Sequence, residues 1–204
     1  MLRNDQLFAL AVYVDDCLLI GRNCKFLFEF KQYFSNRFQI EDLGPASWIL
    51  GYSIIRDGSR GTLSLVQTQY IKDVLSDFGM SECSSASTPL SAKHFEIPNT
   101  QFTASEMPYA KLVGKLLYAS NCTRLDITAS VNYLSRFMSG PTIEHWLQAK
   151  RVLRYLKGTL DKGLMFNKHI PYTPVAWQDS SFADGPGGKS RTRYAVLMCG
   201  ALVA

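Results

Sequence analysis

The sequence lacks the features of a membrane-spanning, secreted or zinc-binding protein. In 204 residues no apolar run approaches the roughly 20 residues that a transmembrane helix requires. The opening MLRNDQLFALAVYV has no small-residue cleavage site, so we expect no signal peptide. Five cysteines without a CxxC pair argue against a disulfide framework and against a zinc site. We therefore expect an intracellular protein, in the cytoplasm or the nucleus, with reduced thiols.

Histidine clusters and phosphate-binding loops are also missing from the sequence. The three histidines, His94, His145 and His169, share no metal-ligand spacing. The stretch GPGGK at 185–189 lacks the Gly-x-x-x-x-Gly-Lys-Ser/Thr spacing of a phosphate loop. The net charge of +5 suits a nucleic-acid partner without proving one. The candidates for chemistry are therefore a few carboxylates and basic side chains.

Two adjacent aspartates, Asp15-Asp16, lie between apolar segments. Residues 7–21 predict a β-hairpin in which this pair is the two-residue break. Neighbouring carboxylates repel each other, so water at an exposed turn or a bound cation must offset the repulsion. From the two letters alone a polar turn is the simpler interpretation. The alternative is a pair of ligands for the Mg²⁺ ions of phosphoryl transfer.

The periodicity of apolar residues indicates a chain that mixes helices and hairpins. A second hairpin is expected at Trp48–Val66, around the turn RDGSRG. Residues 81–106 are rich in Ser, Thr and Pro, which predicts a linker or a long loop. Strands are expected after about Gly163. Helices are expected over residues 25–38, 69–78, from Met107 onward, over 127–138 and over 143–157.

The predicted helix over 143–157 has a basic face and an apolar face. The basic face carries Lys150, Arg151, Arg154 and Lys157, and the apolar face carries Trp146, Ala149, Leu153 and Leu156. A basic stripe on a packed helix suits contacts with nucleic-acid phosphates. The alternative is the solvated face of an ordinary amphipathic helix.

The stretch YVDD within a hairpin resembles the catalytic hairpin of reverse transcriptases, and the segments after it make the resemblance specific. They read, in order, FEFKQYFSNRFQIEDLGPASWILGYSIIRD, LSLVQTQYIKDVL, STPL, PYAKLVGKLLYASNCTRLDITASVNYLSRFM and HWLQAKRVLRYLKGT. This ordered series resembles the reverse transcriptase region of copia-type LTR retrotransposon Pol polyproteins. It extends over about residues 7–165, with a weaker match to the end of the chain.

The resemblance implies an α+β fold in three parts. Residues 1–66 would form the C-terminal part of a polymerase palm, built from antiparallel hairpins and a helix, with Trp48–Val66 as the primer grip. Residues 67–160 would form a helical thumb and connection, interrupted by the linker 81–106. Residues 161–204 would form the first strands of an RNase H-like module.

The resemblance also implies roles for individual residues. Asp15 and Asp16 would be two of the three metal-binding carboxylates of the palm, with Mg²⁺ or Mn²⁺ as cofactor. Tyr13 and Val14 would lie beside the primer terminus and the incoming dNTP. Asp179 would be the first metal carboxylate of RNase H, although Ser, Ser and Phe follow it where the family often has Ala, Asp and Trp. The partner of the intact enzyme would be an RNA/DNA template–primer duplex.

Family chains supply the third palm carboxylate ahead of the hairpin, and no counterpart is found here. We therefore expect that this chain by itself does not polymerise DNA, because positioning and electrostatics supply nearly all catalysis in phosphoryl transfer. The stretch TRLDI also has Leu125 where the family usually has proline. Two further hypotheses stay open: a non-catalytic nucleic-acid-binding remnant, and an inert product of a decayed element.

Overall fold

A computed structural model describes residues 8–91, 107–182 and 190–204 and divides the chain into two compact units. Unit 1 is Met1–Ile49 and unit 2 is Leu50–Ala204. Antiparallel strands and helices make the chain a mixed α+β protein. Its elements are β1 (Phe8–Tyr13), β2 (Asp16–Gly21), α1 (Cys24–Ser35), β3 (Trp48–Ile49), β4 (Tyr52–Asp57), β5 (Thr62–Val66), α2 (Thr68–Asp77), α3 (Tyr109–Cys122), the 3₁₀ helix η1 (Leu125–Ile127), α4 (Thr128–Ser135), α5 (Ile143–Lys157), β6 (Gly163–Asn167), β7 (Val175–Ser181), β8 (Arg191–Met198) and β9 (Ala201–Leu202).

Unit 1 contains the β1–β2 hairpin and helix α1, which are joined by phenylalanine side chains. The Phe8 ring lies 5.0 Å from the rings of both Phe26 and Phe30. Phe30 stacks on Phe34 at 5.4 Å, and Phe34 contacts Phe38 at 4.8 Å. A spacing of four residues places these rings on one helix face. The predicted helix over residues 25–38 is confirmed, although it ends at Ser35.

Unit 2 begins with a hairpin of β4 and β5, and β6 pairs with the other edge of β5. All of these pairings are antiparallel. Gly163 starts β6 at a point where the chains approach closely. A Cβ at this position would lie 2.2 Å from the Leu65 carbonyl oxygen, so a larger residue would push β6 away from β5. The sequence predicted this hairpin over Trp48–Val66, but it begins at Tyr52, because a turn at Leu50-Gly51 ends β3 before it. The predicted strand after about Gly163 is confirmed.

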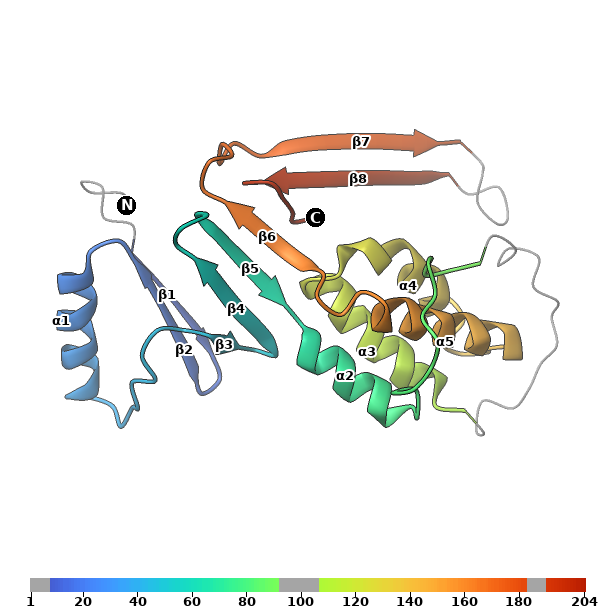
Figure 1. The fold of residues 1–204 in the computed structure, drawn as a ribbon, viewed down its shortest axis with the longest axis horizontal. Helices are drawn as coiled ribbons and strands as arrows, with labels where there is room; N and C mark the ends of the chain where they lie inside the picture. The colour runs from blue at the N-terminus through green and yellow to red at the C-terminus, as the bar shows by residue number, and fades with distance from the viewer. Residues whose placement is uncertain (1–7, 92–106, 183–189) are drawn as a thin grey trace. The chain divides into compact units, whose positions relative to one another are not determined.

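Helices α2, α3, α4 and α5 share one hydrophobic core in unit 2 (Figure 1). Each helix presents apolar residues at intervals of three or four to this core. The helices begin and end within about three residues of the predicted positions, as expected for ends that local signals define poorly. The residues at the centre of the core are Ile71, Leu112, Val113, Leu116, Ile127, Val131, Leu134, Val152, Leu153 and Leu156.

The end of unit 2 forms an antiparallel sheet in the order β7-β8-β9. The backbone N–H of Asn167, at the end of β6, donates to the Cys199 carbonyl at 2.8 Å and ties β6 to the loop before β9. All five cysteines are free thiols. Within the described ranges, no helix combines the length and the apolar character needed to cross a membrane.

Residues 81–91, which we call the strap, have no helix or strand and lie along α5 (Figure 1). The backbone N–H of Ala86 donates to the Arg154 carbonyl at 3.2 Å. At Gly158, just after α5, an added Cβ would lie 2.9 Å from Ser85. The composition predicted a linker or long loop over 81–106. The strap is the described part of it, and residues 92–106 lie outside the described residues.

Candidate functional site

The aspartate pair lies at the tip of the β1–β2 hairpin in unit 1. Cross-strand pairing joins the strands from Phe8↔Gly21 to Tyr13↔Asp16. The turn is therefore Val14-Asp15, and Asp16 is the first residue of β2. The prediction that Asp15-Asp16 forms the break is wrong by one position, because Val14 takes the turn conformation instead of Asp16.

Val14 has a backbone conformation that is rare for its residue type. Its φ is 51°, in the left-handed region that β-branched residues avoid. Hairpin turns usually place Gly or Asn at such a position. Strain of this kind costs about 1–3 kcal/mol and persists only where the surrounding structure fixes the chain. Here the cross-strand register fixes it, and the tip exposes 82% of Val14 and 61% of Tyr13.

Both carboxylates of the tip are exposed. Carboxylate oxygens are the ligands that hard divalent cations prefer. In the part of the chain that the structure describes, no group of three or more His, Cys, Asp or Glu side chains could hold a metal ion. Mg²⁺ commonly takes one or two carboxylates from a protein and fills its other positions with water and substrate phosphate. The two exposed carboxylates of the tip match the number that a protein commonly supplies to Mg²⁺.

Helix α5 carries the second set of predicted site residues. Thr142 caps it: the side-chain oxygen accepts from the His145 N–H, and the His145 Nδ1 accepts from the Thr142 N–H at 3.0 Å. The predicted helix over 143–157 is confirmed with the same bounds. One face is buried through Ala149, Leu153 and Leu156. Lys150, Arg151, Arg154 and Lys157 are each half-buried.

The two arginines of α5 hold the strap. The Arg154 Nε donates to the Ser84 carbonyl at 2.8 Å, and its Nη2 donates to the Ser84 hydroxyl at 3.0 Å. The Arg151 Nη2 donates to the Thr88 hydroxyl at 3.0 Å. Nearer the start of the helix, the Gln148 Oε1 accepts from the Ser91 N–H at 3.2 Å. Sequence reasoning missed this function, because the partners lie more than fifty positions apart.

The two lysines of α5 are arranged differently. The Lys150 ammonium lies 5.9 Å from the centre of the Trp146 ring, a cation–π contact on the helix surface. Lys157 follows the second arginine near the helix end. In the described ranges, none of the four basic side chains forms an ion pair. The predicted basic stripe thus consists of two arginines that hold the strap and two lysines that do not.

Asp179, the third predicted catalytic carboxylate, lies exposed on β7. The strand register sets it directly opposite Arg193 on β8. Opposite charges at a cross-strand position stabilise a sheet modestly. Among the described residues, Asp179 belongs to no metal-binding group of three.

Sequence reasoning missed a buried arginine in unit 2, Arg124 in the stretch TRLDI. The Arg124 side chain is 1% exposed. Its Nε and Nη2 donate to the two carboxylate oxygens of Asp126 at 3.0 and 2.8 Å. Its Nη1 donates to the Thr159 carbonyl at 2.9 Å, and Nη2 also donates to the Thr159 hydroxyl at 2.7 Å. Arg124 therefore ties the loop after α3 to the loop after α5.

The charge of Asp126 is stabilised within this network. Burial acts to raise the pKa of Asp126, but the hydrogen bonds and charge of Arg124 and the hydrogen bond from Tyr155 outweigh it. The pKa is consequently below its usual value. The carboxylate is therefore charged at neutral pH, and its pairing with Arg124 has a structural function.

The chain is similar in sequence to several known proteins. A family model described as "Reverse transcriptase (RNA-dependent DNA polymerase)" matches residues 3–92. The retrovirus-related Pol polyprotein from transposon TNT 1-94 of Nicotiana tabacum is 37% identical over 203 residues, which cover 96% of this chain and 15% of that protein. The Pol polyprotein from transposon RE1 of Arabidopsis thaliana is 34% identical over 89% of this chain and 12% of its own length.

A shorter relative matches along most of its length. The uncharacterized mitochondrial protein AtMg00810 of Arabidopsis thaliana is 36% identical over 174 residues, 85% of this chain and 71% of that protein. No solved structure matches the chain. This chain thus spans about 15% of the TNT 1-94 polyprotein and belongs to the reverse transcriptase family of copia-type retrotransposon Pol polyproteins.

Proposed function

We propose that this chain contributes the catalytic hairpin and part of the nucleic-acid-binding surface of a retrotransposon reverse transcriptase. The observation that carries the proposal is the exposed YVDD tip, fixed by the β1–β2 register, in a chain of this family. Within the intact polyprotein, residues 1–66 would act as palm and primer grip. Residues 67–160 would act as thumb and connection, and residues 161–204 as the beginning of an RNase H-like module.

The hairpin tip would bring the nucleotide-transfer chemistry to the primer. Asp15 and Asp16 would hold Mg²⁺ or Mn²⁺, which favours attack by the primer 3′ hydroxyl and stabilises charge on the leaving pyrophosphate. The aromatic side chain of Tyr13 and the exposed Val14 would contact the primer terminus and the incoming dNTP. A rigid hairpin suits this function, because small displacements of positioning groups reduce the rate strongly.

The second unit would hold the template–primer duplex. Lys150 and Lys157 on α5 would contact backbone phosphates, which fixes register without selecting sequence. Arg151 and Arg154 would contribute charge from the positions in which they hold the strap. Asp179 on β7 would serve the RNase H-like part in the intact polyprotein.

Primer extension tests the polymerase proposal directly. These 204 residues are placed at the matching position of a copia-type Pol polyprotein, which is then assayed on an RNA template with Mg²⁺ or Mn²⁺. We expect Asp15→Asn and Asp16→Asn each to lower kcat by about two to three orders of magnitude. The matched control is Asp161→Asn, an exposed aspartate between α5 and β6 outside the proposed palm and thumb, which should leave kcat unchanged. Equal activity of the tip variants and the control would contradict the proposal.

A second function, binding of nucleic acid without synthesis, is favoured by the α5 cations that lack an ion-pair partner. It applies to the 204 residues by themselves, from which we expect no primer extension. Salt-sensitive duplex binding without dNTP incorporation supports it. Incorporation by the 204 residues alone, lost in Asp15→Asn, would contradict it.

A further inference from the structure

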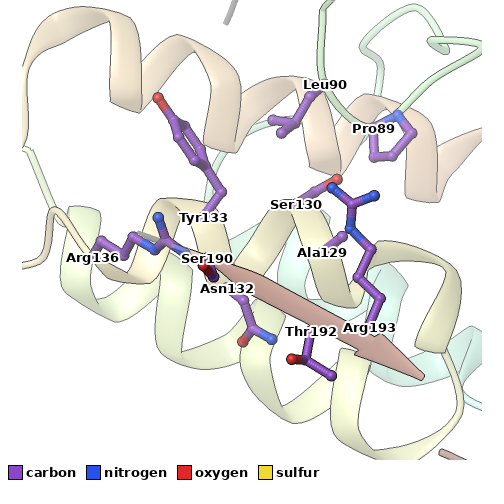
Figure 2. A pocket seen from close by; sticks show the side chains of 10 residues that line it. All are labelled: Pro89, Leu90, Ala129, Ser130, Asn132, Tyr133, Arg136, Ser190, Thr192 and Arg193. Carbon is purple, nitrogen blue, oxygen red and sulfur yellow. The ribbon is translucent and has the colours of Figure 1, made fainter. Parts of the chain in front are cut away.

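A cavity of about 620 Å³ lies in unit 2 between α4, the end of the strap and the start of β8 (Figure 2). None of the residues that line it was assigned a role in the function proposed above. The volume falls within the range of sites that hold a nucleotide-sized ligand. Two of the lining side chains are arginines, Arg136 and Arg193, and none is acidic. A cavity with this charge attracts anions.

Arg136 is the cation best suited to receive an anion. It follows the last residue of α4 and is exposed. Its side chain has no ion pair or hydrogen bond in the described ranges. A planar guanidinium offers paired donors that match the geometry of a phosphate group. Arg193 enters the cavity from β8 (Figure 2), with Asp179 opposite it in the strand register.

The remaining walls are suited to the rest of a nucleotide. Ser130 and Thr192 carry hydroxyl groups that can donate to phosphate oxygens. Pro89 and Leu90 form an apolar wall that can pack against a sugar. These two residues belong to the strap, whose position along α5 is fixed by the hydrogen bonds to Arg151 and Arg154.

We propose that this cavity binds one phosphate, with its attached sugar, of a nucleic-acid strand, through Arg136 as the main ligand. This site would add one contact to the nucleic-acid-binding function proposed above. The choice of a nucleic-acid strand as its ligand rests on that proposed function. The chemistry that the cavity recognises is a nucleoside phosphate. It could come from a strand or from a free nucleotide, and the experiment separates the two sources.

The experiment has two arms and one matched pair of variants. In the first arm, dTMP is titrated into the ¹⁵N-labelled chain at constant ionic strength, and amide shifts are followed by NMR. In the second arm, a fluorescein-labelled RNA/DNA duplex is titrated by anisotropy over a salt series. The variants are Arg136→Gln and, as control, Lys25→Gln, an exposed lysine on α1 outside both the cavity and the proposed primer grip.

We expect saturable dTMP shifts in residues 129–136 and 190–193 that disappear in Arg136→Gln and persist in Lys25→Gln. In the duplex arm we expect the salt slope to fall by about one in Arg136→Gln. The affinity should fall roughly tenfold, the effect of losing one charge-assisted contact.

The outcomes separate this site from the proposed function. Duplex binding that is salt-sensitive and unchanged in Arg136→Gln overturns the site and leaves the function standing. Shifts with dTMP but no duplex binding support a phosphate site, overturn the strand as its ligand and count against the function. If neither dTMP shifts nor duplex binding are observed, the phosphate site and the proposed nucleic-acid-binding function are both overturned.

Discussion

Replacing Arg124 with methionine tests whether the buried network holds unit 2 together. The guanidinium makes four hydrogen bonds, two to Asp126 and two to Thr159. Removing one partner of a buried ion pair costs roughly 3–5 kcal/mol, because the other charge loses its compensation. The Asp126 side chain stays 37% exposed, so water would solvate part of its charge. We therefore expect Arg124→Met to lower the free energy of unfolding by about 3 kcal/mol, near the lower limit of this range.

Urea denaturation followed by circular dichroism at pH 7 measures this loss. With an m value of about 2 kcal/mol/M, the midpoint should fall by about 1.5 M. The control is Arg60→Met in the exposed β4–β5 turn, where we expect a change within about 0.5 kcal/mol. A double-mutant cycle with Asp126→Asn should give a coupling of roughly 2 kcal/mol. If Arg124→Met and Arg60→Met destabilise equally, the reasoning is refuted.

Three further predictions concern α3, α5 and the strap. Burial lowers the pKa of His145 in the folded state, so the unfolded chain takes up this proton at a higher pH than the folded chain. The free energy of unfolding should therefore fall as the pH drops below about 6.5. Urea midpoints measured from pH 8 to pH 5 should show this fall in the unmodified chain and lose it in His145→Gln. Arg154→Gln should open the strap, with hydrogen exchange of residues 81–91 about tenfold faster, whereas Lys157→Gln should leave it unchanged. An added Cβ at Gly114, within α3, meets nothing within 4 Å. Gly114→Ala should therefore raise the free energy of unfolding by about 0.5–1 kcal/mol, which thermal denaturation would show as a higher Tm. A lower Tm would show a contact that the structure lacks.

Local periodicity predicted most of the fold because hairpins and amphipathic helices depend on neighbouring residues. The phenylalanines of α1, spaced by four, stack on one face as expected. Thr142 and Gly158 delimit α5 where capping chemistry places them. At the hairpin tip the local rule failed by one position. Aspartate favours turns more than valine does, but the cross-strand register places Val14 in the turn despite its strained φ.

The strap and the Arg124 network could not be predicted, because both depend on partners far apart in the chain. Composition indicates that residues 81–91 lack regular structure, and that is correct. It carries no information on the hydrogen bonds from Arg151 and Arg154 that fix the strap on α5. Helical periodicity likewise placed these arginines on one face without showing that the strap lies against it. Arg124 and Asp126 in TRLDI give no local sign that the arginine side chain is only 1% exposed.

The central claim is that the hairpin tip binds divalent cations through Asp15 and Asp16. The most direct measurement places these 204 residues, labelled with ¹⁵N, within a copia-type Pol polyprotein, adds Mn²⁺ and records paramagnetic line broadening. The account predicts selective broadening of the amides of residues 12–18, reversed by excess Mg²⁺ and absent in the Asp15→Asn/Asp16→Asn variant. Asp57→Asn should keep the broadening at the tip. Broadening that spares the tip, or that persists in the double variant, would contradict the account.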